Sequence, residues 1–201
     1  MEHAEAPPPT RASGPRGERV WYFAFGANMS SRALSMRQVQ PLHREAAALA
    51  DYRLTFGERG LPLLEPAFAS IEAAPGEVVH GVLMELTGAD FDRIDATEGR
   101  GYALVEVRVR GAVSGSIEAL AFQTRAPVRG RRPSGRYLDL LCEGAREHGL
   151  PPAYIAWLAA QPSLRVPGTR LVSRVLMTLL AAAHRRLGSR GRRSGRPTRL
   201  E

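Results

Sequence analysis

Apolar and alternating segments of strand length fill the first two thirds of the chain. Residues 20–25 are apolar and aromatic throughout, which is typical of a buried strand. Polar and apolar residues alternate over 102–109, as expected for a strand that buries one face. Four further segments are predicted to be strands: 46–56, 68–73, 78–86 and 117–124. About six strands with few helices between them predict a closed or strongly curved mixed sheet, with helices packed outside it and a site at its mouth.

Turn and cap signals separate these strands. Pro75-Gly76 predicts a turn between two of them. Ser30-Ser31 offers N-caps for a short helix after the first strand. Thr87 is expected to cap a second helix, with Asp90 in the position of a capping-box acid. This second helix is expected to end before Gly99.

The pattern becomes helical in the last third of the chain. Ser134 is expected to cap a helix over 137–148, and Pro152 opens another over 153–160. A third helix, with a wide apolar stripe, is predicted from about Thr169 to Gly188. The chain therefore divides into a disordered lead, a folded domain, an amphipathic C-terminal helix and an Arg-rich disordered tail, at 1–19, 20–165, 166–188 and 189–201 respectively.

The charge of the chain belongs mainly to its tail. The formal net charge is +8, and residues 185–201 hold seven arginines and one acid, so +6 of it lies there and +2 in the other residues. A nearly neutral folded body gives no electrostatic footprint for nucleic acid. A solvated tail is expected, with weak contact to an anionic surface as the alternative. The apolar stripe before it is expected to dock on the folded body or on a second copy, which leaves a monomer or a homodimer.

Composition points to a cytoplasmic protein. Cys142 is the single cysteine, so an intramolecular disulfide is excluded and a reducing compartment is favoured. Residues 1–19 contain no apolar core of a secretory signal, and the longest apolar run, 175–183, is too short to span a membrane. The five histidines show no metal-ligand spacing, so no metal is expected.

The turn after the first strand is a candidate binding loop. Gly26 accepts positive φ, and successive N–H groups of such a turn can converge on an anion or a carbonyl oxygen. Asn28 can fold its side chain back to lock the turn. From these residues alone, an ordinary connection between a strand and a helix remains the alternative.

Glu98 is a candidate proton acceptor. It stands between a predicted helix and a strand, with Gly99 and Gly101 after it. A carboxylate held near apolar walls has a raised pKa and can act as a base and then as an acid. An exposed glutamate at a helix end is the alternative, although a carboxylate there lies on the unfavourable side of the helix dipole. The residues alone leave these two interpretations equal.

Four motifs follow one another between about residues 20 and 160. They are Tyr22-Phe23-Ala24-Phe25-Gly26-Ala27-Asn28-Met29, Ile94-Asp95-Ala96-Thr97-Glu98-Gly99 with Tyr102 after it, Pro133-Ser134-Gly135-Arg136-Tyr137, and Gly144-Ala145-Arg146-Glu147-His148-Gly149-Leu150-Pro151. In this order they resemble the motifs of the γ-glutamylcyclotransferase family. The family commonly has Tyr where this chain has Phe25, and often Ser where it has Ala27, so two hydroxyls that could bear on substrate choice are missing from the loop.

The resemblance implies a fold and an activity. The fold is α+β, a compact mixed β-barrel with flanking helices. The activity is release of 5-oxoproline from a γ-glutamyl amine, amino acid or peptide by a carbon–nitrogen lyase, without a cofactor and with Glu98 as proton acceptor and donor. The residues implied around this small-molecule substrate are Tyr22, Phe23, Ala24, Phe25, Gly26, Ala27, Asn28, Tyr102 and Tyr137.

Two other functions compete with this enzyme. The first is a non-catalytic module that binds a γ-glutamyl compound or an amino acid on the same fold. Such a binder has no need of a lone base in a glycine-framed turn, so Glu98 distinguishes the two. The second is an Arg-tailed adaptor for a membrane or RNA, which would depend on residues 169–201 and not on Glu98.

Overall fold

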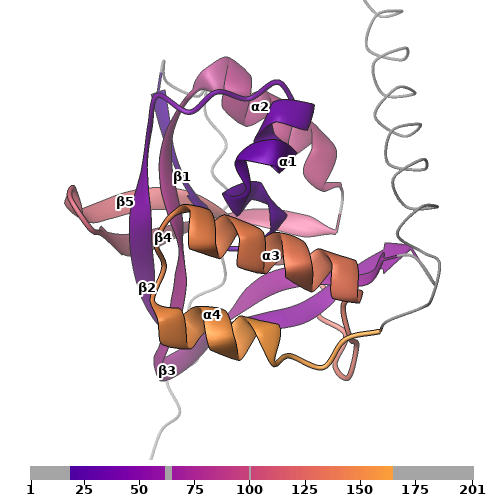
Figure 1. The fold of residues 1–201 in the computed structure, drawn as a ribbon. Helices are drawn as coiled ribbons and strands as arrows, with labels where there is room; N and C mark the ends of the chain where they lie inside the picture. Colours follow the sequence, from indigo (N-terminus) through magenta and orange to yellow (C-terminus); the bar gives the residue numbers. More distant parts are fainter. Residues whose placement is uncertain (1–18, 62–64, 100, 165–201) are drawn as a thin grey trace, which may run out of the picture. The chain divides into compact units, whose positions relative to one another are not determined.

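The computed structural model describes residues 19–61, 65–99 and 101–164, which belong to the compact unit that ends at Arg165 (Figure 1). Five strands form a closed barrel in the order β1-β3-β2-β4-β5. Their bounds are β1 (Arg19–Ala24), β2 (His43–Leu61), β3 (Glu65–Thr87), β4 (Tyr102–Gly111) and β5 (Gly115–Thr124). Neighbours are antiparallel except β1 and β5, whose parallel pairing at Tyr22 and Leu120 closes the barrel. The predicted mixed barrel is therefore confirmed.

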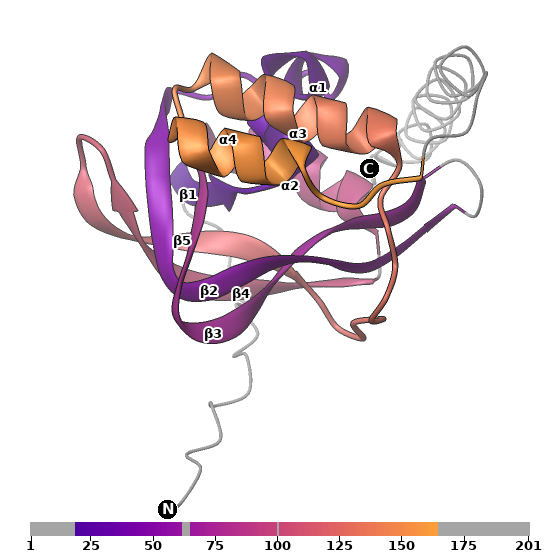
Figure 2. The same ribbon diagram turned by 60° about the horizontal axis from the view of Figure 1, so that its bottom comes forward.

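Helices flank this barrel (Figures 1 and 2). Their bounds are η1 (Ala27–Met29), α1 (Ser31–Met36), α2 (Gly88–Glu98), α3 (Gly135–Glu147) and α4 (Pro152–Ala159). Both views show α3 and α4 side by side, while α2 packs on β1 and β3. The helix predicted over 166–188 and the tail at 189–201 lie outside the described residues. In the part of the chain that is described, every helix is too short or too polar to cross a membrane.

The barrel has one strand fewer than the sequence suggests, because the predicted strands 68–73 and 78–86 are two halves of β3. Both halves pair with β2, since Ala73 lies opposite Tyr52 and Val78 opposite Ala50. The chain does not reverse at Pro75-Gly76 but bulges there. The Asp51 carboxylate accepts the Gly76 N–H at 2.8 Å, so the irregularity on β3 is matched by one on β2. The predicted turn at this point is wrong.

Two of the predicted helix caps are present. The Thr87 hydroxyl accepts the Asp90 N–H at 3.1 Å and donates to the Asp90 carboxylate. The Ser134 hydroxyl accepts the Tyr137 N–H at 3.0 Å. Ser30 is the N-cap residue of α1, but its hydroxyl makes no cap hydrogen bond and is buried without a partner among the described residues.

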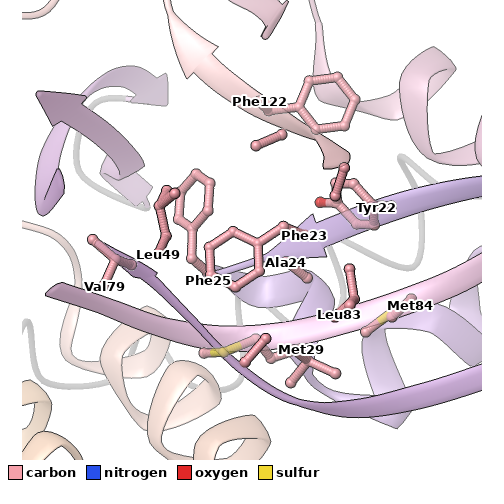
Figure 3. Close-up of a cluster of buried hydrophobic side chains, with 14 of the residues drawn as sticks. Tyr22, Phe23, Ala24, Phe25, Met29, Leu49, Val79, Leu83, Met84 and Phe122 are labelled. Atoms are coloured by element: carbon pink, nitrogen blue, oxygen red, sulfur yellow. The ribbon is translucent and has the colours of Figure 1, made fainter. Parts of the chain in front are cut away.

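The opening strand is buried on both faces, as its continuous apolar sequence predicts. Figure 3 shows that its side chains alternate, with Tyr22 directed toward Phe122 and with Phe23 and Phe25 on the other side. The Phe23 and Phe25 rings lie 6.2 Å apart and are 0% and 5% exposed. One side of this strand therefore carries Phe23 and Phe25 into the core, while the other places the Tyr22 ring against α2 and β5.

Helix α3 approaches η1 so closely that only glycine fits at one position. A Cβ added to Gly144 would lie 2.8 Å from both the Met29 Cβ and the Ser30 nitrogen. Helix propensity alone favours Ala over Gly by about 1 kcal/mol. We nevertheless expect Gly144→Ala to lower the free energy of unfolding by about 1–3 kcal/mol, because overpacking outweighs propensity.

Urea denaturation measures this effect. Glu143→Ala, on the exposed face of the same helix, is the matched control and should change stability by less than about 0.5 kcal/mol. A Gly144→Ala variant as stable as the wild type would show that the contact between α3 and η1 is not tight.

Candidate active site

The site begins where β1 runs into η1. Tyr22 is 4% exposed, and its ring packs edge-on against Phe91 of α2 and Phe122 of β5 at centroid distances of 5.8 and 5.7 Å. Phe91 and Phe122 stack on each other, and Tyr102 contacts Phe122 edge-on. These rings surround the Tyr22 hydroxyl with apolar surface, so it needs a hydrogen-bond partner inside the protein.

Asn28 supplies that partner and extends it to Glu98. The Asn28 Nδ2 donates to the Tyr22 hydroxyl at 2.9 Å and to Glu98 Oε1 at 2.8 Å. Asn28 is 5% exposed, and Glu98 is the last residue of α2, 70 positions further along the chain. Gly99 leaves the helix at φ 76°, a left-handed conformation that glycine adopts without strain. The two motifs thus meet at one amide group.

The pKa of the Glu98 carboxyl is raised above the ordinary value of 4.5, and burial is the main cause. Part of the residue keeps access to solvent, but enough protein surrounds the carboxyl to disfavour its charge. The Arg37 guanidinium and the Asn28 hydrogen bond oppose this rise, and the Asp95 carboxylate adds to it. This is the environment of a group that can both accept and return a proton.

Two further tyrosines are tied to one residue of β3. The Tyr102 hydroxyl donates to the Ala69 carbonyl at 2.7 Å, and the Ala69 N–H donates to the Tyr137 hydroxyl at 3.1 Å. The Ala27 backbone also lies close enough to lower the pKa of Tyr137, although its effect is smaller than that of burial. Burial raises the pKa of Tyr137, so the phenol stays protonated at neutral pH. Because the Ala69 N–H donates to its oxygen, the Tyr137 hydroxyl keeps its own proton to donate.

Two expectations about the loop are wrong. Gly26 does not use positive φ, because its φ is −120°. Its small size matters for another reason, since a Cβ there would lie 3.1 Å from the Tyr137 hydroxyl and 3.4 Å from the Ala69 Cβ. Asn28 does not fold back onto its own turn, because its amide is directed to Tyr22 and Glu98.

The structure brings together most of the predicted site residues, but their side chains differ in what they contact. Tyr22, Asn28 and Glu98 form one hydrogen-bonded group, and Tyr137 contacts the loop at Gly26 and Ala27. Tyr102 is connected to these residues by its hydrogen bond to the Ala69 carbonyl and by its ring contact with Phe122. The side chains of Phe23, Ala24 and Phe25 are buried in the core, so any contact of theirs with a substrate would be through the backbone.

Sequence reasoning missed Ala69 and Arg37. Ala69 acts through its backbone, for which an alanine in an apolar strand carries no signal. Arg37 is the C-cap residue that follows α1, and its Nε donates to the Thr97 hydroxyl at 3.0 Å. It is one arginine in an arginine-rich chain, and only the packing of α1 near α2 shows its relation to Glu98.

Among the described residues, no three His, Cys, Asp or Glu side chains lie close enough together to hold a metal ion. Cys142 is buried in α3, and burial raises the pKa of its thiol. A thiol in that state is a poor nucleophile.

The sequence and the fold of this chain are similar to those of known proteins. Residues 78–158 match the AIG2-like family. The γ-glutamyl cyclotransferase verK of Clonostachys rogersoniana is 32% identical over an alignment that covers 54% of this chain and 71% of verK. The γ-glutamyl cyclotransferase aclK of Aspergillus oryzae is 30% identical, with 77% of this chain and 66% of aclK covered. A solved structure titled γ-glutamyl cyclotransferase matches with a TM-score of 0.68 at 26% identity, covering 75% of this chain and 92% of that one.

The fold and the site define a class of small α+β barrel proteins with a partly buried carboxylate beside the first strand. The chain belongs to the γ-glutamylcyclotransferase family. It spans 66% of the length of aclK, slightly less than two thirds, so the family rests on the likeness to verK and the activity is a proposal.

The raised pKa of Glu98 has a consequence for stability. A group whose pKa is higher in the folded state stabilises the protein fully below its ordinary pKa, and this contribution is lost as pH rises through the folded-state value. Ionised Glu98 therefore costs folding free energy at about pH 7, and Glu98→Gln removes that cost. We expect the variant to melt at a higher temperature than the wild type at about pH 7, with the difference vanishing below the ordinary value of 4.5.

Thermal melts of the two proteins across pH test this expectation. Glu143→Gln, which removes an exposed carboxylate from α3, is the control and should show no such pH-dependent gain. A wild type that is more stable than Glu98→Gln at neutral pH, by a margin that grows with pH, would mean that the folded state favours the ionised carboxylate.

Proposed function

We propose that the chain is a γ-glutamylcyclotransferase that releases 5-oxoproline from a γ-glutamyl amine, amino acid or peptide. The observation that carries this proposal is the partly buried Glu98 carboxylate, held 2.8 Å from the Asn28 amide nitrogen and with a raised pKa. The enzyme would act as a carbon–nitrogen lyase in the cytoplasm, as a monomer or homodimer, on a small-molecule substrate. The reaction as proposed uses no cofactor.

The chemistry is intramolecular. Glu98 accepts a proton from the α-ammonium group of the substrate, and the freed amine attacks the γ-carbonyl carbon to close a five-membered ring. When the tetrahedral adduct collapses, the bond to the leaving nitrogen breaks and Glu98 returns its proton to that nitrogen. The ring nitrogen loses a second proton and the released amine takes one up in water, so charge balances. Reacting groups oriented in one molecule reach effective concentrations of about 10⁵–10⁸ M.

The developing oxyanion needs hydrogen-bond donors. Tyr137 is suited to this role because the Ala69 N–H already donates to its oxygen and leaves its own proton to donate. The backbone N–H groups of residues 26–28 are the other candidates, and that of Ala27 lies near the Tyr137 oxygen. These donors would hold either the oxyanion or the substrate α-carboxylate.

The two departures from the family motif leave this mechanism intact. Phe25 is 5% exposed and packs with Phe23 in the core, so the hydroxyl missing there is missing from apolar surroundings. Ala27 contributes its backbone N–H, which a change of side chain does not remove. Any effect of these two positions on the choice of leaving amine would therefore be larger at Ala27.

Loss of the proton acceptor is the first test. Glu98→Gln keeps the shape of the side chain and can still accept the Asn28 hydrogen bond, but it cannot take up the α-ammonium proton. We expect kcat for 5-oxoproline release to fall by about 10²–10⁴-fold while the protein stays folded. Release is measured across a panel of γ-glutamyl amines, amino acids and peptides, with Glu143→Gln as the control for the loss of one negative charge.

The same assay separates an enzyme from a binding module. If the wild type binds γ-glutamyl compounds without turnover and Glu98→Gln binds them equally well, the chain is a binder and the proposed mechanism fails. If Glu98→Gln turns substrate over at the wild-type rate, another group is the base.

The pH dependence of the rate provides a second test. The base must be ionised to accept a proton, so kcat/KM should rise with pH through the pKa of Glu98, above 4.5. Arg37→Gln removes a positive charge that lowers this pKa, and Asp95→Asn removes a negative charge that raises it. We therefore expect the acidic limb of the profile to move to higher pH in Arg37→Gln and to lower pH in Asp95→Asn. Shifts in the same direction, or none, would assign that limb to another group.

A further inference from the structure

A carboxylate outside the proton-transfer group is more deeply buried than Glu98. Glu65 opens β3 and is 3% exposed. Its Oε2 accepts the Ser134 hydroxyl at 2.5 Å, and its Oε1 accepts the Arg136 Nε at 2.6 Å. Burying a charged pair costs desolvation that its mutual attraction often fails to recover, so such a pair is weak evidence for a purely stabilising role.

The Ser134 hydroxyl connects this carboxylate to Tyr137. The same oxygen that donates to Glu65 accepts the Tyr137 N–H at 3.0 Å. A hydroxyl has one proton, so an acceptor at Glu65 directs that proton toward β3 and leaves a lone pair for the Tyr137 amide. The carboxylate thereby fixes the orientation of the cap at the start of α3.

The other end of Tyr137 is held by the same strand. Its hydroxyl accepts the Ala69 N–H at 3.1 Å, and its ring packs edge-on against Phe68 at a centroid distance of 5.3 Å. Glu65 and Ala69 are four positions apart on β3. One short piece of strand therefore holds the backbone of Tyr137 through Ser134 and its hydroxyl through a peptide N–H.

We propose that Glu65 is a positioning residue for the reaction, which acts through Ser134 to hold the Tyr137 hydroxyl against the Gly26-Ala27 loop. This inference rests on the proposed function, in which that hydroxyl donates to the substrate. Glu65 itself touches neither the substrate nor the proton. Its role is to keep a hydrogen-bond donor in place, and misplacement of such a donor weakens transition-state binding.

A double-mutant cycle tests the proposal. Glu65→Gln removes the charge that orients Ser134 and Arg136 and should lower kcat/KM by about tenfold, the scale of one hydrogen bond to a charged group. Tyr137→Phe should lower kcat/KM by at least as much. If Glu65 acts through the Tyr137 hydroxyl, adding Glu65→Gln to Tyr137→Phe should cause little further loss.

Matched variants keep the test independent of folding. Glu45→Gln changes another buried carboxylate, 7% exposed, which accepts the N–H groups of Val113 and Ser114, and its effect should be the same with or without Tyr137→Phe. Ser134→Ala breaks the same connection without touching a charge. It should reproduce the pattern of Glu65→Gln, and it carries the test if Glu65→Gln does not fold.

A readout without turnover separates this inference from the proposed function. The Ala69 amide resonance in a ¹H–¹⁵N NMR spectrum reports the hydrogen bond to Tyr137, so Tyr137→Phe and Glu65→Gln should both shift it, whereas Glu45→Gln should not. An unmoved Ala69 amide in Glu65→Gln, equal losses of kcat/KM in both backgrounds, or full activity in Tyr137→Phe would each overturn the role of Glu65. Full activity in Glu98→Gln would overturn the proposed mechanism instead.

Discussion

The site depends on one side-chain amide. Asn28 uses both protons of its Nδ2, one for the Tyr22 hydroxyl and one for Glu98, so a rotation of the amide would break both hydrogen bonds. Tyr22 is fixed by the aromatic rings around it, and Glu98 is fixed by the packing of α2 on the barrel. Through this amide, the carboxylate is held in a fixed position relative to the barrel. It also stabilises the ionised form of that carboxylate, against the burial that raises its pKa.

Strand β3 of the barrel holds two tyrosines of the site. The Ala69 carbonyl accepts a hydrogen bond from Tyr102 and the Ala69 N–H donates one to Tyr137, so a single residue of a paired strand positions both phenols. Backbone groups of a barrel move less than side chains on loops, which makes them suitable supports for a site that must orient donors closely. On this account the base is held through Tyr22 of β1 and the hydrogen-bond donors through Ala69 of β3, two strands that pair directly in the barrel.

Local features of the sequence predicted local structure well. The caps at Thr87 and Ser134 involve residues only three positions apart, and alternation identified the strands, so the barrel and its flanking helices were predictable. Contacts between distant residues were not. The bulge that carries β3 through Pro75-Gly76 needs Asp51 from β2, and the small residue at Gly26 is required by Tyr137, 111 positions away. The motifs predicted most of the residues that gather at the site, but only tertiary packing shows that the Asn28 amide donates to Glu98 and not to its own turn.

Titration of the Glu98 carboxyl group tests the account most directly. With ¹³C-labelled glutamate, the Glu98 side-chain carbon can be followed by NMR as a function of pH and assigned by its absence in Glu98→Gln. The account predicts a pKa above 4.5 in the wild type and a still higher one in Asn28→Ala, where the hydrogen bond to the ionised form is lost. A Glu98 that titrates at or below 4.5, or whose pKa does not change in Asn28→Ala, would contradict it.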